Sequence, residues 1–126
     1  MSGTYPWGEP APVLVERACE LQGSLGNVIR MKMIKVLGSH DQAPLSVSEV
    51  AETLGVSQPV ATKHLAVLMK AGWLHRQKDG KRIHYSLNRA TVAEYRWVMD
   101  RAFAHALTPC VNGFDCGTCA YASTCF

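Results

Sequence analysis

Residues 46–87 constrain the fold more than any other part of this chain, because one continuous run combines two short helical patterns, a tight turn and a basic hairpin. Ser46 and Glu49 have the spacing of a capping box, which satisfies two backbone amide donors at the start of a helix. Gly55 can end that helix in the left-handed conformation. Apolar residues recur between them at helical spacing: Val50, Ala51 and Leu54. The sequence therefore predicts a short helix after Ser46, with Val56 filling the turn that follows.

A second helix is predicted from Ser57, which is a good N-cap, to Gly72. Pro59 falls in its first turn, where a missing amide hydrogen costs little. One face is apolar and is expected to pack inward: Ala61, Leu65 and Leu68. Polar side chains near the amino end are expected to face outward: Ser57, Gln58, Thr62 and Lys63.

A hairpin should follow, with strands at 73–78 and 81–87 and an Asp79-Gly80 turn. The second strand alternates as a half-buried strand does, through Ile83, Tyr85 and Leu87. Four basic residues surround the turn: Arg76, Lys78, Lys81 and Arg82. A charged hairpin of this kind can lie along a phosphate backbone or reach into a minor groove.

Two helices joined by a tight turn and followed by a basic hairpin are typical of a winged helix-turn-helix that reads double-stranded DNA. Residues 57–89 carry seven basic side chains and one acidic one, a net charge of +6, whereas the whole chain carries +3. Positive charge is therefore concentrated on the predicted DNA face. Gln58 can pair with adenine, and His64 can contact phosphate or brace the helix. The alternative is an ordinary solvated polar surface.

The stretch LSVSEVAETLGVSQPVATKHLAVLMKAGWLHRQKDGKRIHYSL resembles the ArsR/SmtB winged-helix repressors. VSQPVATKHLAVLMKAG and the hairpin that closes with Tyr-x-Leu carry the resemblance. It covers residues 28–87 in detail and about 10–106 in outline. It implies a homodimeric bacterial repressor that leaves its operator when an inducer, often a thiophilic metal or an oxidant, binds. We expect the operator to be an inverted repeat, and we expect the protein to stay in the cytoplasm because its amino end lacks a charged-then-apolar signal pattern.

The expected architecture is a mainly α fold with a small β-hairpin, in the order α-α-α-α-β-β-α. Further helices are expected at about 12–22, 27–37 and 90–107. In the resembled family the first and last helices form the dimer interface, and the apolar stripe of the last helix fits that role. We expect an N-terminal arm at 1–9, a winged-helix and dimerisation domain at 10–107, and a cysteine-rich tail at 108–126.

The tail is the second informative feature, because its four cysteines have the spacing C-x5-C-x2-C-x5-C: Cys110, Cys116, Cys119 and Cys125. Two residues between thiolates let both reach one ion. Four occupants or states remain open: structural zinc, a soft ion such as As(III), Cd(II) or Pb(II), an iron–sulfur cluster, and a thiol–disulfide switch. Cys19 is expected to be a small core residue, with a further ligand as the alternative.

The chain departs from the resembled family at both of that family's familiar sensing sites. SVSEVAETL, in the helix before the recognition helix, contains no cysteine pair. Arg89 and Thr91 stand where metal-binding Asp and His residues are expected along the last helix. Asp100 and His105 are interpreted as surface groups. Both departures assign the sensing role to the tail.

Other classes of protein find less support. No stretch of about 18 uninterrupted apolar residues predicts a membrane span, and no secretory signal pattern is present. No phosphate loop, nucleophile elbow or carboxylate cluster points to an enzyme. Two alternatives are kept: a constitutive DNA-binding protein with a structural four-cysteine zinc site, and a dithiol redox enzyme that uses the CGTC pair.

Overall fold

The fold is that of a computed structural model, which describes residues 14–39, 43–107 and 109–120. Two compact units can be distinguished in it. Residues 22–92 form one unit, and the described parts of 1–21 and 93–126 form the other. The boundaries between the two units fall inside the first and last helices.

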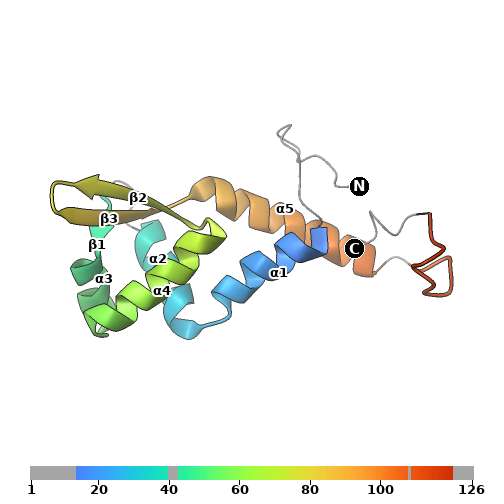
Figure 1. The fold of residues 1–126 in the computed structure, drawn as a ribbon, viewed down its shortest axis with the longest axis horizontal. Coiled ribbons are helices and arrows are strands. Elements are labelled where there is room, and N and C mark those ends of the chain that lie inside the picture. Colours follow the sequence, from blue (N-terminus) through green and yellow to red (C-terminus); the bar gives the residue numbers. More distant parts are fainter. Residues whose placement is uncertain (1–13, 40–42, 108, 121–126) are drawn as a thin grey trace. The chain divides into compact units, whose positions relative to one another are not determined.

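Five helices and a three-stranded antiparallel sheet make up the described structure (Figure 1). The elements in chain order are α1 Leu14–Leu25, α2 Val28–Ser39, β1 Leu45–Ser46, α3 Val47–Leu54, α4 Gln58–Ala71, β2 Leu74–Asp79, β3 Arg82–Leu87 and α5 Arg89–Ala106. The expected mainly α winged helix-turn-helix is confirmed. None of the described helices is both long enough and apolar enough to cross a membrane.

The two helices of the helix-turn-helix begin and end as the sequence predicts. Ser46 caps α3 with both hydrogen bonds of the capping box, and the Ser46 backbone N–H lowers the pKa of the Glu49 carboxyl group. Gly55 ends α3 in the left-handed region at φ 68°. Ser57 caps α4, and Gly72 ends it at φ 94°. Backbone chemistry readable in the sequence therefore fixes the limits of both helices.

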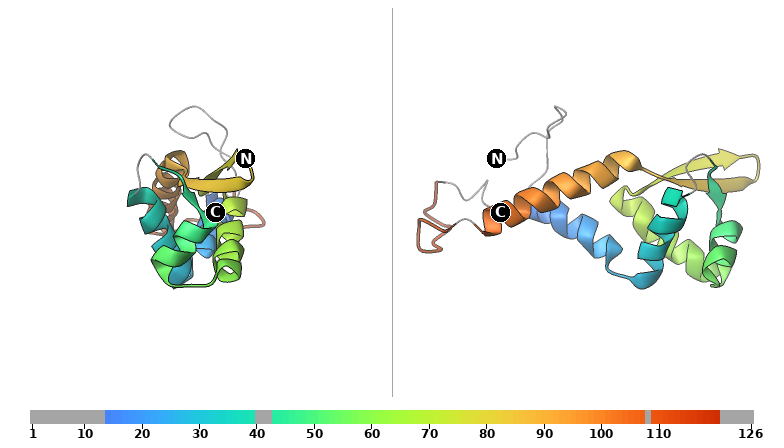
Figure 2. Two further views of the ribbon diagram at one scale, coloured as in Figure 1. Left: turned by 90° about the vertical axis from the view of Figure 1, so that its left-hand side faces the viewer. Right: turned by 180° about the vertical axis from the view of Figure 1, so that it is seen from behind.

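The sheet differs from the expected hairpin in two respects. Asp79 pairs with Arg82, so the central residues of the turn are Gly80 and Lys81, not Asp79 and Gly80. Only Gly80 takes a positive φ, of 61°, which suits the first central position of a type II′ turn. The short strand β1 was not expected; it adds to the outer edge of β3 through the pair Leu45 and Tyr85 (Figure 2).

Helices α1 and α2 both extend beyond their expected ends. Helix α1 continues past Gly23 to Leu25, and the Ser24 side chain on this extra turn accepts a hydrogen bond from the Trp73 indole N–H at 2.6 Å. Helix α2 includes Gly38 and ends at Ser39, whose hydroxyl donates to the Lys35 carbonyl at 2.8 Å. Glycine has a low helix propensity. The bond between Trp73 and Ser24 in α1 and the side-chain bond of Ser39 in α2 offset this cost.

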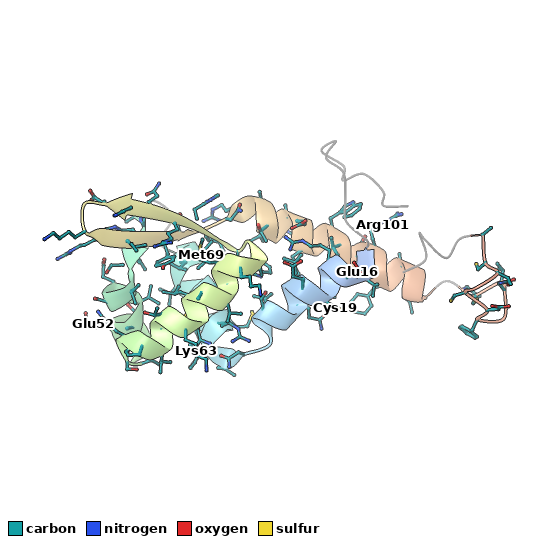
Figure 3. The ribbon with its side chains drawn as sticks, viewed as in Figure 1. Glu16, Cys19, Glu52, Lys63, Met69 and Arg101 are labelled. Carbon is teal, nitrogen blue, oxygen red and sulfur yellow. The ribbon has the colours of Figure 1, made fainter. Side chains whose placement is uncertain are left out.

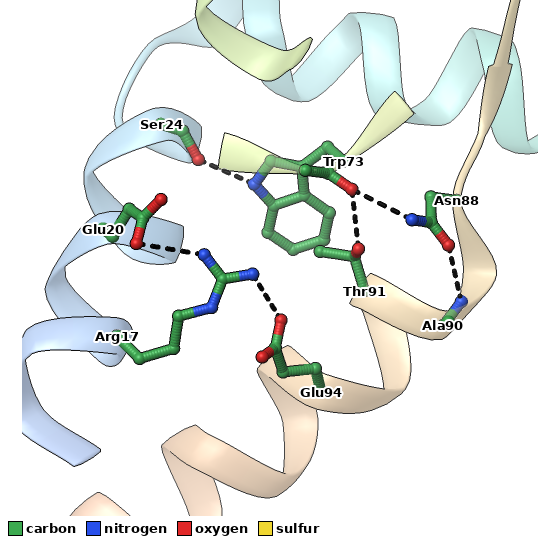
Figure 4. Close-up of polar contacts among 9 residues, drawn as sticks. Arg17, Glu20, Ser24, Trp73, Asn88, Ala90, Thr91 and Glu94 are labelled. Atoms are coloured by element: carbon green, nitrogen blue, oxygen red, sulfur yellow. Dashed lines mark hydrogen bonds and ion pairs between the residues drawn. The ribbon is translucent and has the colours of Figure 1, made fainter. Parts of the chain in front are cut away.

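The junction between α4 and β2, at Gly72 and Trp73, is held by several hydrogen bonds within the unit formed by residues 22–92. Trp73 is 2% exposed, and it is the largest fully buried side chain in the described structure. The Gly72 carbonyl accepts hydrogen bonds from the Asn88 amide at 3.2 Å and from the Thr91 hydroxyl at 2.6 Å (Figure 4). The Asn88 backbone N–H donates to the Trp73 carbonyl at 2.8 Å. These bonds fix the point at which the chain passes from helix to hairpin.

In the other unit, α1 and α5 pack through a small apolar cluster. Ala18 and Val98 are buried there, and Trp97 and Met99 pack against them. An ion pair between Arg17 and Glu94 raises the pKa of the guanidinium group. Cys19, expected in the core, is instead exposed on α1 (Figure 3). The buried face of α1 carries the neighbouring residue Ala18 instead. The prediction that Cys19 is a core residue was therefore wrong.

Ser24→Ala removes the hydroxyl that accepts the buried Trp73 indole N–H, so we expect the free energy of unfolding to fall by roughly 1–3 kcal/mol. Urea unfolding monitored by tryptophan fluorescence measures the change. Ser39→Ala is the control, because Ser39 is exposed and its hydroxyl bonds only within its own helix. Equal effects of the two substitutions would contradict the role assigned to the junction.

Candidate nucleic-acid interface

The amino-terminal half of α4 presents a polar surface on a fixed support. The inner face is fully buried, with Ala61, Leu65 and Leu68 all at 0% exposure. The predicted outward residues are all exposed: Ser57, Gln58, Thr62 and Lys63. Figure 3 shows Lys63 projecting from the outer side of α4. The hydroxyl of Ser57 accepts a bond from the Val60 backbone N–H, so Ser57 caps the helix whatever else it contacts.

Gln58, the first residue of α4, has a side-chain partner that sequence reasoning missed. Its amide nitrogen donates a hydrogen bond to the hydroxyl of Ser48 on α3. Both side chains are exposed. The two residues are ten positions apart, and no pattern of local spacing links them. Only the angle between the two helices brings them together.

His64 braces α4 and is not freely solvated. Its Nδ1 lies 3.1 Å from the Arg30 guanidinium on α2, and Arg30 also donates to the Ser24 carbonyl at 2.6 Å. Because arginine can only donate, Nδ1 accepts, and the ring is neutral with its proton on Nε2. Burial, followed by the charges of Arg30 and Lys63, lowers the pKa of His64. Of the two roles considered from the sequence, the described contacts favour bracing.

The hairpin presents its basic side chains to solvent. All four predicted residues are exposed: Arg76, Lys78, Lys81 and Arg82. None of them forms an ion pair with another described residue. Cationic side chains without such partners can neutralise phosphates, which releases condensed counterions. The hairpin tip and the outer face of α4 therefore offer the two kinds of contact that duplex recognition needs, one electrostatic and one through hydrogen bonds.

Arg89 and Thr91, at the start of α5, have structural partners. The Arg89 guanidinium donates to the Gly38 carbonyl at 3.1 Å, and the Thr91 hydroxyl donates to the Gly72 carbonyl at 2.6 Å. Thr91 is buried. Sequence reasoning noted both positions only as departures from a metal site. The structure gives them an additional role, which is to hold α2 and α4 against the start of α5.

The tail forms a series of turns over residues 109–120. The Phe114 backbone N–H donates to the Cys110 sulfur at 3.3 Å, with Phe114 itself in the left-handed region at φ 66°. Backbone hydrogen bonds from Asn112 and Phe114 lower the pKa of the Cys110 thiol. The Asn112 amide also donates to the Asp115 carbonyl at 2.6 Å. These backbone bonds thus favour the thiolate form of Cys110, which is the form that binds metals.

The described part of the tail does not assemble a metal site. Cys116 and Cys119 lie one turn apart, with the Cys119 backbone N–H 3.4 Å from the Cys116 carbonyl. Across residues 14–39, 43–107 and 109–120, no group of three or more His, Cys, Asp or Glu side chains is arranged to hold a metal ion. Cys125 lies outside the described residues. The described tail therefore offers a soft ion the sulfurs of Cys110, Cys116 and Cys119, and its turn favours the thiolate at Cys110.

Comparison with known proteins places this geometry among transcriptional regulators. A MarR family model matches residues 34–82. A helix-turn-helix-type transcriptional regulator from Mycobacterium tuberculosis is 38% identical over 65 residues, covering 52% of this chain and 61% of the relative. A probable mercury resistance operon repressor from Streptomyces lividans is 28% identical over 71 residues, covering 56% of this chain and 54% of the repressor. The chain thus spans less than two thirds of the length of both relatives.

Solved structures match over a longer stretch. An ArsR-like transcriptional regulator from a Rhodococcus species superposes with a TM-score of 0.63 at 24% identity, over 73% of this chain and 84% of that chain. The chain is thus similar in fold to ArsR-like regulators. Another similar structure is the homodimeric winged helix-turn-helix domain of a possible ArsR-family regulator from Mycobacterium bovis. It has a TM-score of 0.57 at 20% identity, over 74% of this chain and 84% of that chain.

The lowered pKa of Cys110 predicts that its thiolate persists at a lower pH than that of an ordinary cysteine. Alkylation requires the thiolate. In metal-free, reduced protein, iodoacetamide should therefore modify Cys110 with a rate profile shifted to lower pH relative to N-acetylcysteine in the same buffers. Peptide mass spectrometry at each pH gives the rate. A profile that coincides with that of N-acetylcysteine would show that the loop does not stabilise the thiolate.

Proposed function

We propose that this protein is a transcriptional repressor of the ArsR/SmtB type that binds double-stranded operator DNA. One observation carries the proposal: the exposed polar face of α4 stands on a fully buried inner face, and four exposed cationic side chains without ion-pair partners among the described residues occupy the hairpin. In winged helix-turn-helix proteins, the second helix enters the major groove. We assign base contacts to residues at the amino end of α4 and phosphate contacts to the hairpin. The α4 residues are Ser57, Gln58, Thr62 and Lys63, and the hairpin residues are Arg76, Lys78, Lys81 and Arg82. His64 is assigned a supporting role in the interface, in which it braces α4 against α2.

The repressor acts as a homodimer on an inverted repeat in this proposal. Large apolar side chains are exposed on α5 and directly after it, with Phe103 61% exposed and Leu107 82% exposed. Val15 on α1 is also exposed. Burying such surface against a second copy is favourable, and the Mycobacterium bovis domain is described as homodimeric. The proposed organisation keeps an arm at 1–9, the winged-helix and dimerisation domain at 10–107 and the tail at 108–126.

Replacing two hairpin lysines with neutral residues tests the DNA-binding proposal. For Lys78→Gln/Lys81→Gln, we expect weaker binding to every duplex and a slope of log K against log salt that is smaller by about 2, because each phosphate that is no longer neutralised lowers the slope by about 1. Fluorescence anisotropy with labelled duplex over a range of salt concentrations gives the slope.

Lys32→Gln/Lys35→Gln is the matched control for this experiment. It removes the same charge from two exposed lysines of α2 and should leave the salt slope close to that of the unmodified protein. Equal losses of affinity in the two double variants would mean that overall charge, and not the hairpin, drives binding. No duplex binding by the unmodified protein at modest ionic strength would overturn the proposed function itself.

The cysteine tail is the proposed sensing segment. Its four cysteines stand close together in sequence, and the turn after Cys110 lowers the pKa of that thiol. Arg89 and Thr91 stand at the positions where ArsR/SmtB repressors carry metal ligands on the last helix. Here both side chains donate hydrogen bonds to backbone carbonyls. The similar Streptomyces lividans protein is a probable repressor of mercury resistance. Thiolates select soft metals, so a soft ion, a metalloid, an iron–sulfur cluster or a redox change at these sulfurs is proposed to lower operator affinity.

Loading the reduced protein with Cd(II), arsenite or Hg(II) should weaken operator binding about 5- to 150-fold, which is the usual range of allosteric coupling. Cys116→Ser/Cys119→Ser should bind DNA equally with and without the added ion. Cys19→Ser is the control that removes an exposed thiol on α1 and should respond as the unmodified protein does. Anaerobic absorption spectra and elemental analysis of the purified protein identify zinc or iron and sulfide in the same preparations.

Unchanged affinity under every loading condition would overturn the sensing proposal but leave DNA binding intact. The protein would then be a constitutive DNA-binding protein whose tail is held by structural zinc. In that case, chelation should lower the melting temperature without releasing DNA. The sensing proposal and the structural-zinc alternative can be distinguished, because the first predicts a change in DNA affinity and the second predicts a change in melting temperature.

A further inference from the structure

The hydrogen bond between Ser48 and Gln58 joins the two helices of the helix-turn-helix at their exposed amino ends. Ser48 is the second residue of α3, and Gln58 is the first residue of α4. The hydroxyl of Ser48 accepts one of the two hydrogens on the Gln58 amide nitrogen. The carboxamide therefore keeps its oxygen acceptor and one N–H donor. These are the two groups that a glutamine uses on the N6 and N7 edge of adenine.

The terminal torsion of a glutamine is broad and has no strongly preferred angle. An unrestrained carboxamide therefore rotates between orientations that exchange its donor and acceptor. In the structure the bond is made with the amide nitrogen of Gln58 toward Ser48, and this bond restricts rotation of the carboxamide. The carbonyl oxygen of Gln58 is thereby placed on the other side. Holding the amide in one orientation before DNA arrives lowers the entropy lost on binding.

Ser48 is itself held by the rigid start of α3. It lies between Ser46 and Glu49, whose side chains form the two hydrogen bonds of the capping box. The next residues, Val50 and Ala51, are buried at 0% and 4% exposure. A site placed on a packed helix keeps its geometry better than one placed on a loop.

We propose that Ser48 is a positioning residue for base recognition, which orients the Gln58 carboxamide so that it selects an A·T pair in the operator. The inference rests on the proposed function, because it assumes that α4 enters the major groove. It goes further by assigning base selectivity to a residue outside the recognition helix. Ser48 needs no contact with a base for this role.

The test begins with selection of binding sites by the unmodified protein from a pool of random duplexes. The position read by Gln58 is the one whose base preference disappears in Gln58→Ala. Dissociation constants are then measured for the preferred duplex and for the three replacements of that base pair. At this position, Ser48→Ala should reduce discrimination roughly 3- to 10-fold, as expected for the removal of one hydrogen bond. Ser48→Thr, which keeps a hydroxyl, should restore most of it.

Thr53→Ala is the matched control, because Thr53 is an exposed hydroxyl residue on the same helix that donates only to the Glu49 carbonyl, at 2.8 Å. It should leave base preference unchanged. Circular dichroism melting of each variant establishes that α3 remains folded, and Ser48→Thr tests the role even where Ser48→Ala unfolds.

Two results would overturn the positioning role. One is a uniform loss of affinity for all duplexes in Ser48→Ala, which would indicate a phosphate contact. The other is unchanged discrimination at the position read by Gln58. Failure of the unmodified protein to select any sequence would instead overturn the proposed function, and this inference with it.

Discussion

The burial of Trp73 at the end of α4 is the constraint on which the placement of the proposed DNA-binding surface, formed by the polar face of α4 and the hairpin, depends. Its indole N–H donates to Ser24, and the adjacent Gly72 carbonyl accepts from Asn88 and Thr91. These contacts bring α1, the start of α5 and the α4–β2 junction together within residues 22–92. A buried polar network of this kind is stable only when its members are paired. Because α4 and the hairpin diverge from this junction, its geometry sets the direction of both.

Helix α4 has a buried inner face and an exposed outer face. Ala61, Leu65 and Leu68 are fully buried, while the outward positions remain available. His64 lies between these two faces. Its Nδ1 contacts Arg30, and burial, followed by the charge of Arg30, lowers the pKa of its ring. Groups that contact DNA gain most when they are held in place before binding. The bonds from Arg30 and Ser48 show how neighbouring helices provide this restraint.

In the proposed function, the sensing cysteines lie in the tail, away in sequence from the DNA-binding residues of α4 and the hairpin. Arg89 and Thr91 are engaged in hydrogen bonds that hold the unit formed by residues 22–92. Cys110 instead belongs to a segment held by its own turns, in which backbone N–H groups favour a thiolate. A locally built segment can respond to a soft ion without loss of the buried network around Trp73.

The sequence by itself determined the limits of α3 and α4, because capping residues and left-handed glycines act through bonds a few residues apart. It also determined where positive charge gathers and which residues of α4 face outward. Tertiary structure decided the last turn of α1, the added strand β1, the exposure of Cys19 and the register that centres the hairpin turn on Gly80 and Lys81. It alone paired Ser48 with Gln58 and Arg30 with His64. Such contacts depend on angles between helices, and those angles follow from the packing of side chains distant in the chain, which no local pattern records.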